Sequence, residues 1–172
     1  MKEFIICVDE NDKKIGVEEK IKVHKEGILH RAFSIFIFND KKELLLQRRA
    51  LEKYHSPGLW TNTCCSHQRE NETLKEAALR RIEEEMGFKC ELNESFVFSY
   101  KVRFDDGLIE NEIDHVFIGT YTGKIFINKD EVKEYKWITI EEVIKDIELN
   151  PQKYTYWFKD IINKYAENIF AV

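Results

Sequence analysis

The chain has 172 residues, of which 43% are hydrophobic and 34% are charged, with seven glycines, two prolines and four cysteines. This composition excludes collagen, low-complexity disorder and a disulfide-stapled miniprotein, and it favours one packed domain over residues 1–172. The 27 basic and 32 acidic residues are interspersed and give a net charge of −5. That balance argues against a nucleic-acid or anionic-membrane partner, because such binders neutralise phosphates with basic surfaces.

The N-terminal segment has an apolar run of only a few residues before charged residues resume. Such a run is too short for a secretory signal and far below the about 20 residues of a membrane span. The adjacent Cys64–Cys65 pair and the missing signal both argue against a disulfide framework. We therefore expect a cytoplasmic protein with reduced thiols and no membrane span, and the sequence indicates no particular oligomeric state.

Apolar runs and turn residues predict the strands. Residues 3–8 and 32–38 are predicted strands, and the second is expected to be buried on both faces because its apolar run is almost unbroken. A turn at 39–42 leads into a further strand at 44–46. The remaining predicted strands are 95–104, 110–121 and 134–138.

Three helices are predicted from capping signals and apolar stripes. Residues 73–86 begin with a capping box of Thr73 and Glu76 and stop at Gly87. A second helix runs from Thr139 to about 147, and a third is predicted to start at Asn150–Pro151, as N-cap followed by proline. The order strands, helix, strands, helices indicates an α+β fold rather than a doubly wound parallel sheet.

The segment 60–67 places two thiols and an imidazole close together. If this segment is extended, Cys65 and His67 share one face and Cys64 takes the other, so a chemically active thiol should be Cys65. The alternative is that both cysteines are small buried apolar residues, as most free cysteines are. A zinc ribbon needs a second cysteine pair, which Cys90 alone does not provide.

Two carboxylates, Glu110 and Glu112, are expected on the same face of a strand. A solvated sheet edge explains most such pairs. The pair becomes a metal site if imidazoles converge on it, and His24, His30 and His67 are candidates. Histidine and carboxylate ligands together suit Zn, Mn or Fe.

The helix 73–86 carries two arginines followed by three glutamates at 80–85. Its ordinary interpretation is an exposed face with ion pairs within the helix. A carboxylate cluster of this kind can also hold Mg²⁺, the usual partner of a diphosphate. Basic residues that fit the same ligand precede the cysteine segment: Lys20, Arg48, Arg49 and Lys53.

Taken together, these residues resemble the type I isopentenyl-diphosphate isomerases, a branch of the Nudix fold, over roughly residues 4–158. The Nudix box is degenerate: when Gly87 is aligned with its last glycine, Ser66 stands in place of its first glycine and Arg81 in place of a glutamate. The matching segments are Glu19–Lys20, His24, His30–Phe33, Leu46–Ala50, Pro57–Asn62, Cys65–His67, the helix 73–86 with its arginines and glutamates, Tyr100, Glu110–His115 and Trp157.

The resemblance implies a Nudix-like fold with a mixed β-sheet core flanked by helices. It also implies an isomerase of isoprenoid biosynthesis that interconverts isopentenyl and dimethylallyl diphosphate by a 1,3-allylic proton shift through a tertiary carbocation. Cys65 would be one proton-transfer group and Glu112, assisted by Tyr100, the other, while Trp157 would stabilise the cation.

The same resemblance implies two metal sites and a diphosphate site. Mg²⁺ would accompany the prenyl diphosphate and be held by Glu85, and a further divalent metal (Mn²⁺, Zn²⁺ or Mg²⁺) would occupy a histidine and glutamate site. The ligands of that further metal would be His24, His30, His67, Glu110 and Glu112. The diphosphate would meet Lys20, Arg49, Lys53 and Arg81.

Two other functions compete with this interpretation. One is a Nudix hydrolase that cleaves a nucleoside or prenyl diphosphate, against which Ser66 and Arg81 count. The other is a non-catalytic metal-binding domain with Cys64, Cys65 and His67 as structural ligands, which would carry a thiolate-bound zinc and show no turnover.

Overall fold

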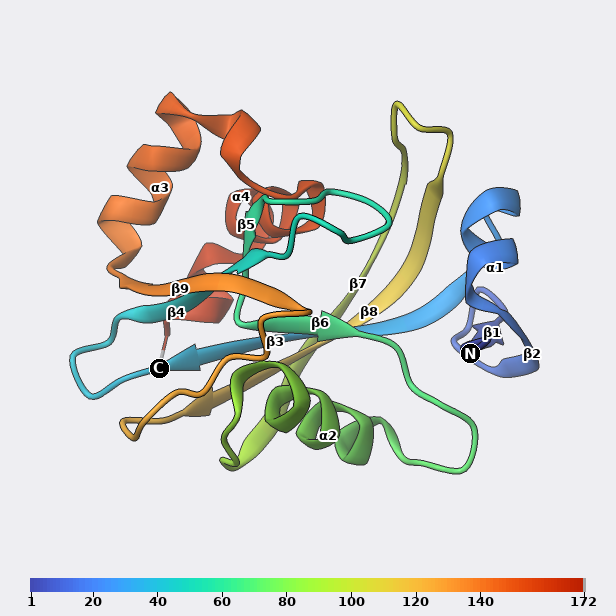
Figure 1. Cartoon of the computed structure of the whole chain (residues 1–172), viewed down its shortest axis with the longest axis horizontal. Coiled ribbons are helices and arrows are strands. Elements are labelled where there is room, and N and C mark those ends of the chain that lie inside the picture. Colours follow the sequence, from blue (N-terminus) through green and yellow to red (C-terminus); the bar gives the residue numbers. More distant parts are fainter. Residues whose placement is uncertain (172) are drawn as a thin grey trace.

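The computed structural model describes residues 1–171, and within them nine strands form one sheet (Figure 1). The expected α+β architecture with a mixed sheet is confirmed, because β3 pairs with β8 in parallel while the other pairs of strands are antiparallel. The strands are β1 (Phe4–Val8), β2 (Lys14–Glu19), β3 (His30–Phe38), β4 (Leu44–Arg49), β5 (Trp60–Thr61), β6 (Cys64–Ser66), β7 (Leu92–Arg103), β8 (Ile109–Thr120) and β9 (Val132–Ile138). The helices are α1 (Lys20–Glu26), α2 (Leu74–Met86), α3 (Ile140–Leu149), the 3-10 turn η1 (Pro151–Lys153) and α4 (Tyr156–Phe170).

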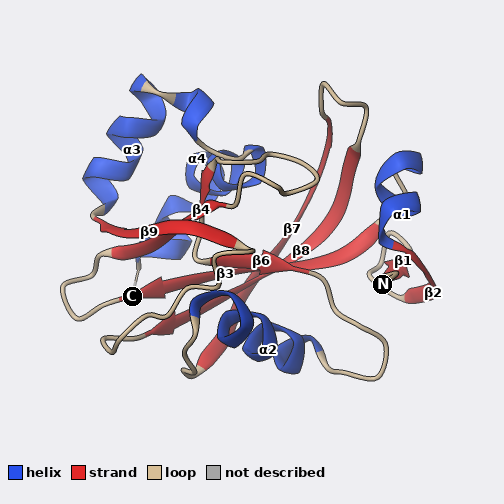
Figure 2. Cartoon of the chain, viewed as in Figure 1, coloured by secondary structure: helices blue, strands red, loops and turns tan. Residues whose placement is uncertain are grey.

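Helices cover both faces of the sheet, with α2 on one side and α3 and α4 on the other (Figure 2). Strand β3 explains this arrangement, because its alternate side chains enter two separate cores. Phe33, Ile35 and Ile37 pack in the core under α2. Phe36 and Phe38 pack in the core under α3 and α4. The strand is therefore buried on both faces, as its sequence predicts.

The α4 face of the sheet changes from apolar to polar along two neighbouring strands. On β3, Phe36 is apolar, whereas Ser34, two residues nearer the start of the strand and on the same face, is polar. On β8, Val116 is apolar, whereas Asp114 and Glu112, which precede it on the same face, are carboxylates. The parallel register pairs His30 of β3 with Glu112 of β8. The polar ends of the two strands thus lie side by side, next to the apolar core.

Local signals predict α2 and α3 correctly. Both helices have the expected capping boxes, at Thr73 and Thr139, and Gly87 ends α2 in the left-handed region with φ of 74°. This conformation is one that glycine adopts without steric cost.

The predicted third helix starts in the wrong place. Pro151 begins only the 3-10 turn η1, and Asn150 directs its side chain to Asp146 instead of capping a helix. The chain then extends so that the Thr155 amide donates to the Trp60 carbonyl of β5, at 3.0 Å. Because of this pairing, α4 begins only at Tyr156.

Two short elements near the N-terminus, β2 and α1, are not among the predicted elements. Strand β2 has no buried residue, and α1 has no side-chain cap at its start, so neither has the pattern that identifies an element from sequence. In residues 1–171 no helix has the length and apolar character that a membrane crossing requires.

Candidate active site

One pocket opens at the polar end of the α4 face of the sheet. The residues that line it include nearly all of those expected to act on a substrate: Lys20, Arg49, Lys53, Cys65, His67, Arg81, Tyr100, Glu110, Glu112 and Trp157. The other expected residues, His24, His30 and Glu85, are buried next to the pocket and contact the lining residues Glu110 and Arg81. The fold therefore gathers the whole predicted set at one place.

Cys65 and Glu112 reach the pocket from different strands. Cys65 lies on β6 opposite Ser34 of β3, and Glu112 lies on β8, where the Tyr100 hydroxyl donates to its Oε1 at 2.7 Å. Burial raises the pKa of the Cys65 thiol to about 12, so this group carries a proton at neutral pH. A proton donor and a carboxyl group thus lie in the wall of a single pocket.

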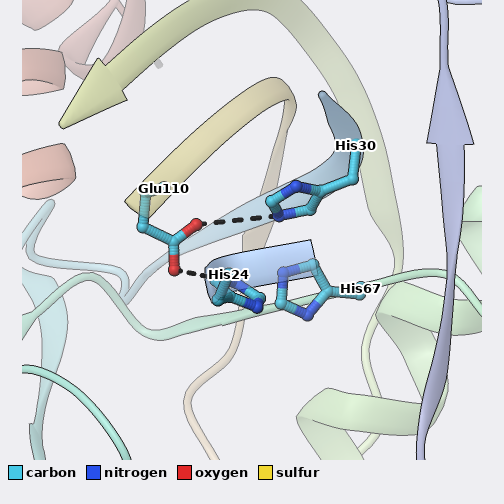
Figure 3. A group of neighbouring side chains, drawn as sticks. All are labelled: His24, His30, His67 and Glu110. Atoms are coloured by element: carbon cyan, nitrogen blue, oxygen red, sulfur yellow. Dashed lines mark ion pairs between the residues drawn. The ribbon is translucent and has the colours of Figure 1, made fainter. Parts of the chain in front are cut away.

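Three histidines and Glu110 converge beside the pocket (Figure 3). His24 comes from α1, His30 from the start of β3 and His67 from the segment after β6, while Glu110 comes from β8. One ligand atom from each of the four residues lies within 4.8 Å of the others. Four segments distant in sequence therefore offer a set of nitrogen and oxygen donors to one point.

The hydrogen bonds of this cluster orient its histidines for metal binding. The Nδ1 atoms of His24 and His30 donate to the backbone carbonyls of Lys20 and Ile28, at 2.6 and 2.8 Å. Each Nε2 then carries a lone pair and has no hydrogen-bond partner, and Glu110 Oε2 is buried without a partner as well. Buried polar atoms are rarely left unpaired, so these residues fit a bound divalent cation.

Burial and mutual repulsion set the charges of the cluster. Burial lowers the pKa of His30 to about 4 and that of His67 well below its usual value, so both rings are neutral at pH 7. Burial and the adjacent Glu110 charge raise the pKa of Glu112. For Glu110 burial also acts to raise the pKa, but the neighbouring Glu112 carboxyl and the imidazoles of His24 and His55 outweigh it and lower the pKa.

Glu112 lies at the edge of this cluster. Its Oε2 is 4.0 Å from Nε2 of His30 and 4.0 Å from Nε2 of His67. Glu110 is nearer, with Oε1 at 3.1 Å from Nε2 of His24. The geometry therefore groups Glu110 with the histidines and leaves Glu112 between them and Tyr100.

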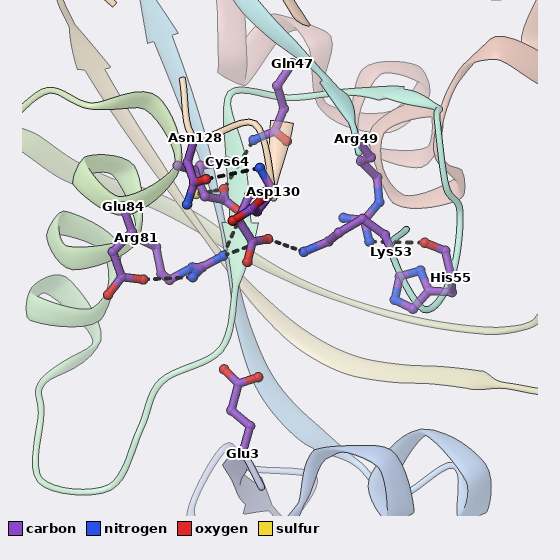
Figure 4. A network of polar contacts seen from close by, with 12 residues as sticks. Glu3, Gln47, Arg49, Lys53, His55, Cys64, Arg81, Glu84, Asn128 and Asp130 are labelled. Atoms are coloured by element: carbon purple, nitrogen blue, oxygen red, sulfur yellow. Dashed lines mark hydrogen bonds and ion pairs between the residues drawn. The ribbon is translucent and has the colours of Figure 1, made fainter. Parts of the chain in front are cut away.

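Four cations border the pocket, and three of them are paired with carboxylates. Figure 4 shows Lys53, Arg81 and Arg49 among these cations. Lys20 contacts Glu3 at 3.1 Å, and Lys53 and Arg81 both contact Glu131, Arg81 at 3.5 Å. The fourth cation, Arg49, lies 5.3 Å from the ring centroid of Trp157. Arg49 is 6% exposed, and its Nε has no partner, so it is a buried donor suited to an anion.

Glu85 is held from two sides. Arg81 donates to its Oε1 at 2.7 Å, and the Cys64 thiol donates to its Oε2 at 2.7 Å, beside a Gln47 amide at 3.2 Å. Cys64 faces away from the pocket into the core under α2, as strand alternation predicts. Its contact with Glu85 could not be read from the sequence.

Some polar residues of the site, among them His55 and Asp114, are not singled out by the sequence. His55, in the loop between β4 and β5, has Nε2 at 2.6 Å from Glu110 Oε1, and Asp114 accepts a 2.7 Å hydrogen bond from Ser34. His55 follows Arg49 and Lys53 closely in sequence, which is the one signal that could have identified it. Asp114 shares strand parity with Glu110 and Glu112.

Comparison with known proteins adds a family match and close relatives. A NUDIX domain model matches residues 28–158. The chain is 47% identical over 164 residues to "Isopentenyl-diphosphate Delta-isomerase 2" of Aromatoleum aromaticum, which covers 95% of this chain and 87% of that protein. It is 50% identical over 163 residues to the protein of the same name from Photorhabdus laumondii, covering 95% and 92%.

Solved structures agree on the fold. The Deinococcus radiodurans protein DR0079 superimposes with a TM-score of 0.77 at 16% identity, over 95% of this chain and 99% of that one. A MutT protein from Methanosarcina mazei gives a TM-score of 0.67 at 20% identity, over 81% and 94%. The expected Nudix-like fold is thereby confirmed.

Proposed function

The chain belongs to the isopentenyl-diphosphate Delta-isomerases of the NUDIX family, and from this premise we propose how its pocket acts on the substrate. The enzyme interconverts isopentenyl diphosphate and dimethylallyl diphosphate. The reaction moves a double bond by one position, so one proton is added at a carbon and another is removed from a different carbon. Two proton-transfer groups must therefore reach the hydrocarbon.

Cys65 and Glu112 are the two proton-transfer groups in this proposal. The observation that carries it is their placement in the wall of one pocket on separate strands, β6 and β8, with the Tyr100 hydroxyl 2.7 Å from Glu112. The raised pKa of Cys65 suits a group that holds a proton until the alkene takes it up. Tyr100 orients Glu112 and donates to its charged form.

Trp157 stabilises the tertiary carbocation that lies between the two proton transfers. Its ring is 3% exposed and lines the pocket. A cation against an indole face gains roughly 0.5–2 kcal/mol, with the larger value where water is excluded. A dry pocket also protects the cation from capture by water.

The diphosphate is bound by Lys20, Arg49, Lys53 and Arg81. Three of these cations already contact carboxylates, and an incoming diphosphate would compete for them with its own charge. Arg81 stands where a hydrolase of this family has a glutamate, which favours binding of the diphosphate over its cleavage.

Divalent metal binding completes the site. His24, His30, His67 and Glu110, with Glu112 at the edge, would hold one divalent cation (Mn²⁺, Zn²⁺ or Mg²⁺), and Glu85 would hold the Mg²⁺ that arrives with the diphosphate. A cation bound among these groups would favour the ionised form of Glu112, which is the form that accepts a proton.

Nuclear magnetic resonance of isopentenyl diphosphate with the enzyme and Mg²⁺ tests the proposal. We expect dimethylallyl diphosphate to appear while the phosphorus signals of the diphosphate stay intact. Release of inorganic phosphate or pyrophosphate without an isomerised product would instead support the hydrolase and overturn the proposal.

A further inference from the structure

A fourth histidine, His55, contacts the metal cluster from the loop between β4 and β5, and it is not among the four residues whose ligand atoms converge. We infer that His55 is a positioning residue that holds Glu110 so that one carboxylate oxygen faces the metal. The inference rests on the metal site of the proposed function. It assigns to His55 no contact with the metal or the substrate.

The two oxygens of Glu110 have different surroundings. Oε1 lies 2.6 Å from His55 Nε2 and 3.1 Å from His24 Nε2, whereas Oε2 is 3.7 Å from His30 Nε2 and has no hydrogen-bond partner. Glu110 is 2% exposed, so its carboxylate is almost closed to bulk solvent. Oε1 is therefore fixed by the protein, and Oε2 is the oxygen left open to a cation.

His55 is arranged to donate rather than to accept. The Ser56 hydroxyl lies 3.3 Å from His55 Nδ1 and can donate to it, which places the ring proton on Nε2, toward Glu110. Both ring nitrogens then have partners within the protein. The Nε2 atoms of His24 and His30 lack partners, and this difference separates a supporting histidine from a ligand.

Packing fixes the His55 ring without help from its hydrogen bonds. The ring stacks on Phe104 with centroids 5.0 Å apart and an interplanar angle of 19°, and it meets Trp157 edge-on at 5.6 Å. Its backbone carbonyl accepts from Arg49 Nη2 at 3.1 Å. A flat apolar ring at position 55 can therefore keep this packing while it loses the donor to Glu110.

Mn²⁺ binding to the metal-stripped protein, followed by electron paramagnetic resonance, tests the inference without an activity measurement. We expect His55→Phe to weaken Mn²⁺ binding by about 10–100-fold, the usual cost of losing a partner of a metal ligand. His55→Gln keeps a donor nitrogen at similar reach and should recover most of the affinity. His115→Gln is the control, because His115 bridges Asp12 and Glu94 on the other side of β8 from the pocket.

The outcomes separate the role of His55 from the site itself. Equal Mn²⁺ affinity of His55→Phe and the unaltered protein, or equal weakening in His55→Gln and His55→Phe, would overturn the inference. No Mn²⁺ binding by the unaltered protein would overturn the proposed metal site and the inference with it. If His55→Phe does not fold, the same comparison is made between His55→Gln and His55→Met, which has similar length and no donor.

Discussion

At the scale of single residues, strand alternation gives two adjacent thiols different surroundings. Cys65 faces the pocket and its polar groups, while Cys64 enters the core under α2 and donates to Glu85. Cys64 is buried and Cys65 is partly buried, and burial raises the pKa of each thiol. The difference between them is therefore one of access to the substrate rather than of acidity.

Replacing Cys65 tests its part in proton transfer. We expect Cys65→Ala to lower kcat by about 10²–10⁴-fold, the usual contribution of a positioned acid or base, with a smaller change in KM. Cys90→Ala is the matched control, since Cys90 is a half-buried thiol outside the pocket. A normal kcat for Cys65→Ala would contradict this role and would show that Cys65 is a structural thiol.

Asp114 links a buried carboxyl group to the pH dependence of stability. Burial raises its pKa from 3.8 to about 7, so between these values the folded state holds a proton that the unfolded state releases. The free energy of unfolding contributed by Asp114 therefore falls as pH rises through this range. We expect Asp114→Asn to raise the melting temperature at pH 8 and to have much less effect at pH 4. A change of the same size at both pH values would contradict this explanation.

At the scale of elements, helix α2 anchors the loop that carries Glu131. The amides of Phe126 and Asn128 donate to the carbonyls of Met86 and Glu85, at 3.0 and 2.9 Å. The end of α2 thereby places the loop at residues 121–131 against the cations of the pocket. Gly87 makes this approach possible, because a side chain there would meet Phe126.

A pair of glycine substitutions separates this contact from backbone strain. Gly87 and Gly107 both have positive φ, but a Cβ at Gly87 would lie 2.8 Å from Phe126 Cβ, while nothing lies within 4 Å of one at Gly107. We expect Gly107→Ala to lower the free energy of unfolding by about 1–2 kcal/mol, because alanine is strained in this left-handed backbone conformation. Gly87→Ala should lower the free energy of unfolding by about 1–3 kcal/mol more, because its Cβ would also crowd Phe126. Urea unfolding measures both, and equal losses would show that the Phe126 contact is unimportant.

The elements also show which parts of the fold could be predicted from the sequence. Capping boxes and glycine stops are local, so the starts of α2 and α3 are predicted correctly. The start of α4 depends on pairing between Thr155 and Trp60, which are distant in sequence, and no local pattern records it. Helix α1, which carries His24, also lacks a local signal, because no side chain caps its start.

At the scale of the whole molecule, the site is made where several segments meet. The resemblance identified the residues that line the pocket or flank it, but the partners that fix them had to come from the structure. His55 contacts Glu110, and Cys64 contacts Glu85. In each pair the two residues are distant in sequence, so no local pattern predicts that they meet. The sequence therefore predicts which residues gather at the pocket, but not the contacts that hold them in place.

Metal binding should stabilise the whole fold, with a defined pH dependence. His30 and His67 have pKa values lowered by burial, so in the metal-free protein their protonation favours unfolding, and stability falls as pH drops from about 6.5 toward 4. Mn²⁺ at 100 times its dissociation constant adds about 2.7 kcal/mol to the free energy of unfolding. We expect melting curves to shift upward with Mn²⁺ at pH 7.5 and to shift less at pH 5. The same shift in a His24→Ala, His30→Ala, His67→Ala protein would contradict the site.

In the proposed reaction, Cys65 and Glu112 transfer protons to and from the hydrocarbon in one pocket. Nuclear magnetic resonance of isopentenyl diphosphate turned over in D₂O tests it most directly. We expect deuterium in the dimethylallyl diphosphate and, through the reverse reaction, in recovered isopentenyl diphosphate, with uptake lost in both Cys65→Ala and Glu112→Gln. Isomerisation without deuterium uptake, or undiminished uptake in either variant, would contradict the claim.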